Sequence, residues 1–185
     1  MILHVTSIGL LACSLYAQAP VNPGLAAVRQ FEDRVAEYMS LRAKLKPESK
    51  PLKPTPSTEK ILAHEHELAK RISAARADAL RGEIFTPEVA VEFRRLIAIT
   101  MHGPDAPAIR ASLIRAEPVW LKALRVNHLY PHDVPLQSTP PSLLLHLPSL
   151  PRELQYRVVG NALVLLDVGA DLIVDYLPHA IDPVP

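Results

Sequence analysis

Cysteine is almost absent from this chain of 185 residues, which contains Cys13 alone. One thiol cannot form an intramolecular disulfide, and zinc–thiolate sites or iron–sulfur clusters need several. Removal of an N-terminal leader ending at Ala17 would also remove Cys13 and exclude a cysteine nucleophile. A domain without cross-links or such metal sites must be held together by its apolar core.

Charged side chains are missing from the first 19 residues, where no Asp, Glu, Lys or Arg occurs. An apolar segment over 8–15 is followed by Ala17-Gln18-Ala19, the small-x-small pattern of a secretory signal peptide. We expect residues 1–17 to be that signal peptide, with cleavage after Ala19 as the alternative. The apolar segment is far shorter than the roughly 20 residues that span a bilayer. The chain is therefore expected to be periplasmic or secreted, without a transmembrane span.

Two alternatives to simple export remain open. The residues Leu-Leu-Ala before Cys13 resemble a lipoprotein acylation box, which would place a lipid anchor on that cysteine. The leader also lacks the positively charged residues that usually open a signal peptide, so a chain that is not exported is the second alternative.

Recognised catalytic motifs are missing as well. The chain has no Gly-x-Ser-x-Gly elbow, no Gly-x-Gly-x-x-Gly and no phosphate-binding loop. Neighbouring acids such as Glu32 and Asp33 diverge on a helix and cannot act on one substrate as acid and base. We therefore expect a protein that is not an enzyme and has no cofactor. A hydrolase whose catalytic groups converge from distant segments is the alternative.

Nucleic-acid binding has little support, because the formal net charge is only +1. Two expected helices joined by Met-His-Gly-Pro-Asp-Ala-Pro loosely suggest a helix-turn-helix, with Arg110 and Arg115 facing a groove. Two arginines make a weak basic surface, and export contradicts the role, so we expect no nucleic-acid partner.

Glycine is scarce and proline abundant, with 6 and 19 residues respectively. This composition favours stiff connections and helices with sharp ends. Prolines and lysines concentrate in residues 47–57, which we interpret as a linker. The expected organisation is an N-terminal helix within 18–46, this linker, a single α+β domain over 58–178, and a tail over 179–185. Whether the first helix packs on the domain is left open.

Apolar residues recur at helical spacing in four segments. Asn22-Pro23 is expected to start the first helix, which continues to about Lys46. The second spans about 59–81, the third begins at Thr86-Pro87 and ends at Gly103, and the fourth follows Asp105. Residues 119–126 could form a strand, and 142–147 a single helical turn.

Three short strands are expected in the last quarter of the chain, over 154–159, 162–166 and 172–176. Gly160-Asn161 and the segment 167–171 would form the turns between them, because Gly, Asn and Asp favour turn conformations. The fold class is therefore α+β, with about four amphipathic helices packed on a three-stranded antiparallel meander.

The sequence His64-Glu65-His66-Glu67 suggests a metal site, but helix geometry opposes it. At 100° per residue the two histidines point about 200° apart, so one ion cannot take both. Leu68 also stands where the zinc motif His-Glu-x-x-His needs its second histidine. A helix surface and a weak metal site are the two interpretations.

Other potential ligands are scattered, and the sequence leaves unknown which residues, if any, bind a metal. Further histidines lie on expected loops and helix ends: His102, His128, His132, His146 and His179. Asp167, Asp171 and Asp175 surround one turn, where oxygen ligands could hold a hard cation such as Ca²⁺, although the twelve-residue calcium loop is absent. Asp is equally common in turns for reasons unrelated to metals.

The C-terminal region resembles a known family. Its Leu147-Pro148-Ser149-Leu150-Pro151, the segment Tyr156-Arg157-Val158-Val159-Gly160-Asn161 and the strand Ile173-Val174-Asp175 are similar to the β-module of exported RcnB-like proteins of nickel and cobalt homeostasis. The resemblance covers about 40 residues. It implies a small periplasmic β-module and a link to metal stress, but it carries over no ligand residue.

Together these observations predict an exported protein of the bacterial envelope that binds a protein or peptide partner without catalysis. Long amphipathic helices and the apolar, acidic meander would supply the contact surfaces. A periplasmic metal-responsive protein of the RcnB-like type is the main alternative.

Overall fold

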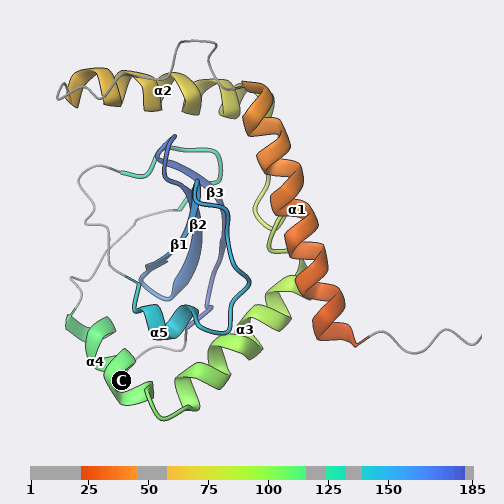
Figure 1. Cartoon of the computed structure of the whole chain (residues 1–185), viewed down its shortest axis with the longest axis vertical. Helices are drawn as coiled ribbons and strands as arrows, with labels where there is room; N and C mark the ends of the chain where they lie inside the picture. Colours follow the sequence, from red (N-terminus) through yellow and green to blue (C-terminus); the bar gives the residue numbers. More distant parts are fainter. Residues whose placement is uncertain (1–21, 46–57, 116–123, 132–138, 182–185) are drawn as a thin grey trace, which may run out of the picture.

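The computed structural model describes residues 22–45, 58–115, 124–131 and 139–181, and it has the expected α+β architecture. Within these residues five helices and three strands follow one another, with all three strands near the C-terminal end (Figure 1). The expected signal peptide, the proline-rich linker and His132 lie outside the described residues, as does Trp120, the sole tryptophan of the chain.

The sheet is an antiparallel meander of β1 (Leu154–Val159), β2 (Ala162–Asp167) and β3 (Leu172–Leu177), in the order β1-β2-β3. The predicted strands are confirmed, with β2 and β3 each one residue longer than expected. Gly160 has φ of 59°, a left-handed conformation that glycine adopts readily, and Val159 pairs with Ala162 across the turn. Asp167 belongs to β2 and not to the following turn.

A β-bulge in β3 determines which side chains face the helices. Leu165 pairs with Asp175 and Leu166 with Ile173, so Val174 is an additional residue without a partner on β2. Simple alternation would place Asp175 on the same face as Ile173. The bulge reverses this, and Asp175 shares a face with Leu165 instead.

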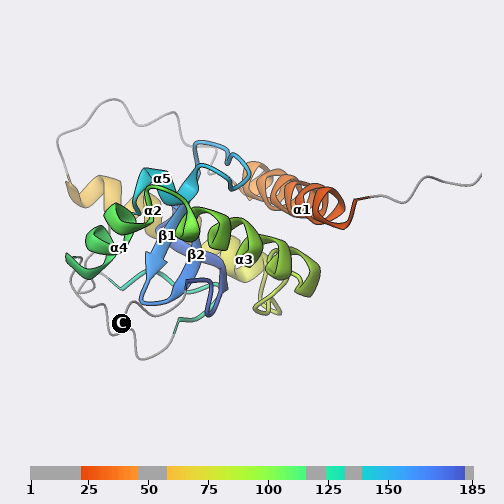
Figure 2. The ribbon, with the colours of Figure 1, turned by 90° about the horizontal axis from the view of Figure 1, so that it is seen from below.

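The helices are α1 (Pro23–Leu45), α2 (Thr58–Ala75), α3 (Pro87–His102), α4 (Ala106–Arg115) and the single turn α5 (Pro141–Leu144). Two of the predicted caps are confirmed by hydrogen bonds. Gly24 N donates to the Asn22 side chain over 3.0 Å, and Val89 N donates to Thr86 Oγ1 over 3.4 Å. Figure 2 shows these helices around the sheet from a second direction.

One expected helix boundary is wrong, and one expected strand is described only at its end. α2 ends at Ala75 and not near residue 81. At this end the Asn127 side chain donates to Ser73 O in the last turn and to Arg76 O just after it. These tertiary hydrogen bonds compete with the helical propensity of the following residues. The strand predicted over 119–126 is not present in its described part, 124–126, and the rest of it lies outside the described residues.

The main core lies between the helices and one face of the sheet. Side chains from α1, α2, α3 and α5 meet β1, β2 and β3 there, so α1 packs on the same core as the sheet. The rings of Phe31 and Phe93 lie 4.7 Å apart, and those of Phe85 and Phe93 lie 5.3 Å apart. A smaller cluster on the opposite face is built from Tyr130 and strand residues.

Candidate functional site

The histidines predicted as possible metal ligands are dispersed over the described surface. His66 in α2 is exposed, and the side chain of His64 is outside the described part. His102 donates to Ala98 O over 2.8 Å, and His146 Nδ1 lies 3.0 Å from Thr100 Oγ1. Within 22–45, 58–115, 124–131 and 139–181, no group of three or more His, Cys, Asp or Glu side chains could hold a metal ion.

Asp167, from the suggested cation site, is instead an anchor for α1. Its carboxylate is fully buried and accepts hydrogen bonds from Tyr38 Oη over 2.7 Å and from Arg42 Nε over 2.6 Å. Gly169 N and Ala170 N donate to the second oxygen. With both oxygens occupied, this carboxylate ties the helix to the end of β2 and leaves little capacity for a cation.

The same contacts shift the pKa values of two neighbouring side chains, Tyr38 and Arg42. Burial raises the pKa of Tyr38, and the charge of Asp167 and the hydrogen bond to it raise that pKa further. Burial would lower the pKa of Arg42, but the hydrogen bond and the charge of Asp167 outweigh it and the pKa is raised. Tyr38 is therefore a neutral donor, not a base, and Arg42 remains charged.

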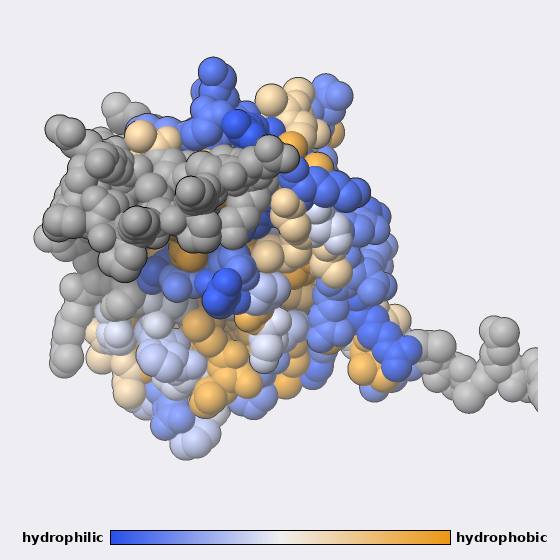
Figure 3. Space-filling view, turned by 45° about the horizontal axis from the view of Figure 1, so that its top comes forward, coloured by the Kyte–Doolittle hydropathy of each residue, from blue (hydrophilic) through white to orange (hydrophobic). Residues whose placement is uncertain are grey.

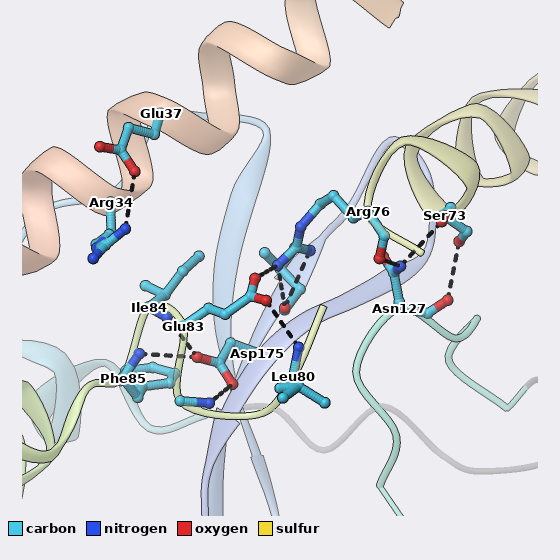
Figure 4. A network of polar contacts seen from close by, with 12 residues as sticks. Arg34, Glu37, Ser73, Arg76, Leu80, Glu83, Ile84, Phe85, Asn127 and Asp175 are labelled. Carbon is cyan, nitrogen blue, oxygen red and sulfur yellow. Dashed lines mark hydrogen bonds and ion pairs between the residues drawn. The ribbon is translucent and has the colours of Figure 1, made fainter. Parts of the chain in front are cut away.

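Asp175 forms a second anchor on the same face of the sheet (Figure 4). Its buried carboxylate accepts hydrogen bonds from the backbone N–H groups of Gly82 over 3.0 Å, Ile84 over 2.9 Å and Phe85 over 2.9 Å. It thereby orders the loop between α2 and α3 and takes backbone donors that would otherwise be buried without partners.

A polar cavity of about 310 Å³ lies between this loop and α1. Its charges are paired within the protein: Arg34 with Glu37 at 3.3 Å, and Arg76 with Glu83 at 3.0 Å. Arg76 also donates to Val174 O (Figure 4). Because each acid forms an ion pair with an arginine, these charges stabilise the fold. They do not form a pair of acids that could act together on one substrate.

Arg110, considered for a nucleic-acid groove, donates through Nη2 to Met101 O over 2.7 Å. It therefore joins α4 back to α3. The side chain of Arg115 lies outside the described residues.

A groove of about 430 Å³ along the edge of β1 has a different character. The mostly apolar segment 144–150, which begins with the last residue of α5, forms one wall, and four consecutive residues of β1 form the other. Neighbouring residues of a strand point to opposite faces, so a cavity that contacts all four must run along the strand edge. The described lining is Thr139, Leu144, Leu145, Leu147, Pro148, Ser149, Leu150, Leu154, Gln155, Tyr156 and Arg157.

Two side chains of this groove stand out. Leu145 is 71% exposed, a large apolar residue beside a cavity of ligand size. Arg157 is the one charged residue in the described lining, and its Nε is buried without a hydrogen-bond partner. Its Nη2 donates to Gln155. Figure 3 shows hydrophobic residues gathered between hydrophilic ones on one face of the molecule.

Sequence reasoning missed this groove, although part of the signal was present. Leu143-Leu144-Leu145 exceeds what a single helical turn can bury on one side, and Leu143 is fully buried while Leu145 is exposed. Its position beside the outer edge of β1 depends on tertiary packing that no local pattern encodes.

Comparison with protein-family models, curated proteins and solved structures found no match to this chain. Among the described helices, none combines the length and apolar character needed to cross a membrane.

Proposed function

We propose that the chain is an exported, non-catalytic binding protein of the bacterial envelope that holds an extended polypeptide segment in the groove beside β1. The observation that carries the proposal is the lining itself, in which the edge of a strand faces a row of leucines. A strand edge supplies backbone hydrogen bonds to an extended peptide, and apolar pockets beside it select side chains.

The charged side chains at the centre of the described fold support binding over catalysis. Asp167 and Asp175 are saturated with donors, and the acids of the polar cavity are paired with arginines. A hydrolase would need a free nucleophile and base in one cleft. A metal-responsive protein would need ligands drawn partly from outside the described residues, since those inside form no suitable group.

Binding to an array of short immobilised peptides tests the proposal, using the purified exported chain. Leu145→Ser should weaken binding at least several-fold, because this exposed leucine contributes apolar contact area to the bound segment. Leu80→Ser is the matched control, since Leu80 is equally exposed at 73% but is absent from the groove lining. Absence of any peptide binding, or equal losses in both variants, would refute the proposal.

A further inference from the structure

We infer that the groove recognises the C-terminal end of its partner, which adds to β1 as a short parallel strand and places its terminal carboxylate against Arg157. The inference rests on the proposed function and specifies its ligand: an extended peptide with a free carboxylate and an apolar residue next to the last one.

The argument begins with the backbone groups on the outer edge of β1. Paired residues of antiparallel strands alternate between those that bond each other and those whose groups point outward. Val158 N donates outward to Thr139 Oγ1 over 3.1 Å, so Tyr156 and Leu154, two and four residues before it, also point outward.

Of the four backbone N–H and C=O groups of Leu154 and Tyr156, two already have hydrogen-bond partners. Leu154 N donates to Pro151 O over 2.9 Å, and Thr139 Oγ1 donates to Tyr156 O over 3.3 Å. Among the described contacts, Leu154 O and Tyr156 N–H remain for another chain.

The two remaining groups, Leu154 O and Tyr156 N–H, favour an added strand that runs parallel to β1. An added antiparallel strand exchanges both bonds with one residue, and neither Leu154 nor Tyr156 offers both its N–H and its C=O. One residue of a parallel strand instead donates to the carbonyl before its partner and accepts from the N–H after it. Leu154 O and Tyr156 N–H, on either side of Gln155, match that pattern.

Thr139 then limits the length of the added strand. Its hydroxyl occupies Tyr156 O and Val158 N, the next two groups that a parallel strand would need. The added chain must therefore leave the edge or end opposite Gln155. If it ends there, its carboxylate accepts from Tyr156 N–H on the side of the strand that carries Arg157.

Arg157 supplies the charge complement. It alternates with Tyr156 and so shares a strand face with Gln155, and no described acid forms an ion pair with it. Its Nε is buried without a partner, and a carboxylate in the groove would instead meet the other N–H donors of this guanidinium and give it a counter-charge. The residue before the last would point to the opposite face, toward Leu145 and Leu147.

The test uses two pools of short randomised peptides, identical except that one has free C-terminal carboxylates and the other is amidated. Retention on the immobilised full chain is measured by mass spectrometry. Wild-type protein should retain the free-carboxylate pool roughly tenfold better, enriched in leucine, isoleucine or valine at the position before the last.

Arg157→Gln should remove the preference for the carboxylate while leaving weak retention of both pools. Arg152→Gln is the matched control, since Arg152 has a side chain 92% exposed just before β1 and is absent from the groove lining. A cooperative unfolding transition measured for each variant confirms that both fold.

The outcomes separate the two proposals. Equal retention of both pools by wild type, or an unchanged preference in Arg157→Gln, overturns carboxylate recognition and leaves peptide binding in place. Retention of neither pool by wild type overturns the proposed function as well.

Discussion

At the scale of single residues, two buried carboxylates carry much of the specificity of the fold. Asp167 and Asp175 project from the same face of the sheet, one toward α1 and the other toward the loop that precedes α3. Charged groups are rarely fully buried unless they are paired and hydrogen-bonded, and both of these are. Each carboxylate therefore ties one segment, α1 or the loop before α3, to one position over the sheet.

Asp167→Asn should lower the free energy of unfolding by about 3 kcal/mol or more, because it leaves the largely buried Arg42 without its counter-charge. Urea denaturation followed by circular dichroism measures this. Tyr38→Phe, which removes one donor and keeps the ion pair, should have a smaller effect of about 1.5 kcal/mol. A change below 1 kcal/mol in Asp167→Asn would show that the ion pair is not an anchor.

The buried tyrosines predict sensitivity to alkali. Burial raises the pKa of both Tyr38 and Tyr156, so the folded protein keeps them neutral at a pH where the unfolded chain ionises them. Their contribution is present below the unfolded pKa of about 10 and is lost as pH rises above it. Unfolding free energy should fall by about 1.4 kcal/mol per pH unit for each tyrosine.

Denaturation curves measured at increasing pH above neutrality check this dependence. Tyr38→Phe should reduce the slope above about pH 10 by the share of one tyrosine. An identical slope in wild type and variant would mean that Tyr38 ionises in the folded protein.

At the scale of elements, the sequence predicts the presence of helices and strands better than it predicts where they end. The three strands and the caps at Asn22 and Thr86 follow from local chemistry, and the structure agrees. The end of α2 is hydrogen-bonded to Asn127, about fifty residues later in the chain, and the facing of Asp175 depends on a bulge. Contacts of that kind are set by packing, so local periodicity cannot reveal them.

The candidate site, too, is predictable from the sequence only in part. The sequence marks Asp167 and Asp175 as possible cation ligands, but their partners, Arg42 and the backbone of 82–85, lie about 90 to 125 residues away. The groove combines segments around Thr139, Leu145 and Tyr156 whose proximity is a property of the folded chain.

Thr86 joins two elements, because its hydroxyl accepts from Val89 N at the start of α3 and donates to Gln30 of α1 over 3.1 Å. Thr86→Ala should therefore lower the free energy of unfolding by about 1 kcal/mol, the usual effect of losing an N-cap. Thr86→Ser, which keeps the hydroxyl, should recover most of it. Chemical denaturation of the two variants measures the difference, and equal losses would assign the effect to the methyl group.

At the scale of the whole molecule, the sheet and helices share one core in which α1 is an integral part. Phe31, Val35 and Tyr38 of α1 are buried against the sheet and α3. A chain lacking residues 22–45 would expose the apolar surface that these side chains cover.

We therefore expect the chain without residues 22–45 to lose cooperative thermal unfolding and to bind a hydrophobic dye. Calorimetry and dye fluorescence measure the two properties. A sharp transition in the shortened chain would show that α1 is dispensable for folding.

The hydroxyl of Thr139 has a consequence for solubility. The opposite edge of the sheet is covered, since Asn127 N donates to Ile173 O of β3 and Ile173 N donates to His128 O. On the outer edge of β1, the Thr139 hydroxyl occupies both Tyr156 O and Val158 N in the described structure. Uncovered strand edges pair with other copies of the same chain. Thr139→Val should make the protein associate as its concentration rises, which light scattering would detect, and a monomer at all concentrations would assign the shielding to other groups. One hydroxyl would then separate a surface that admits a short peptide end from one that polymerises.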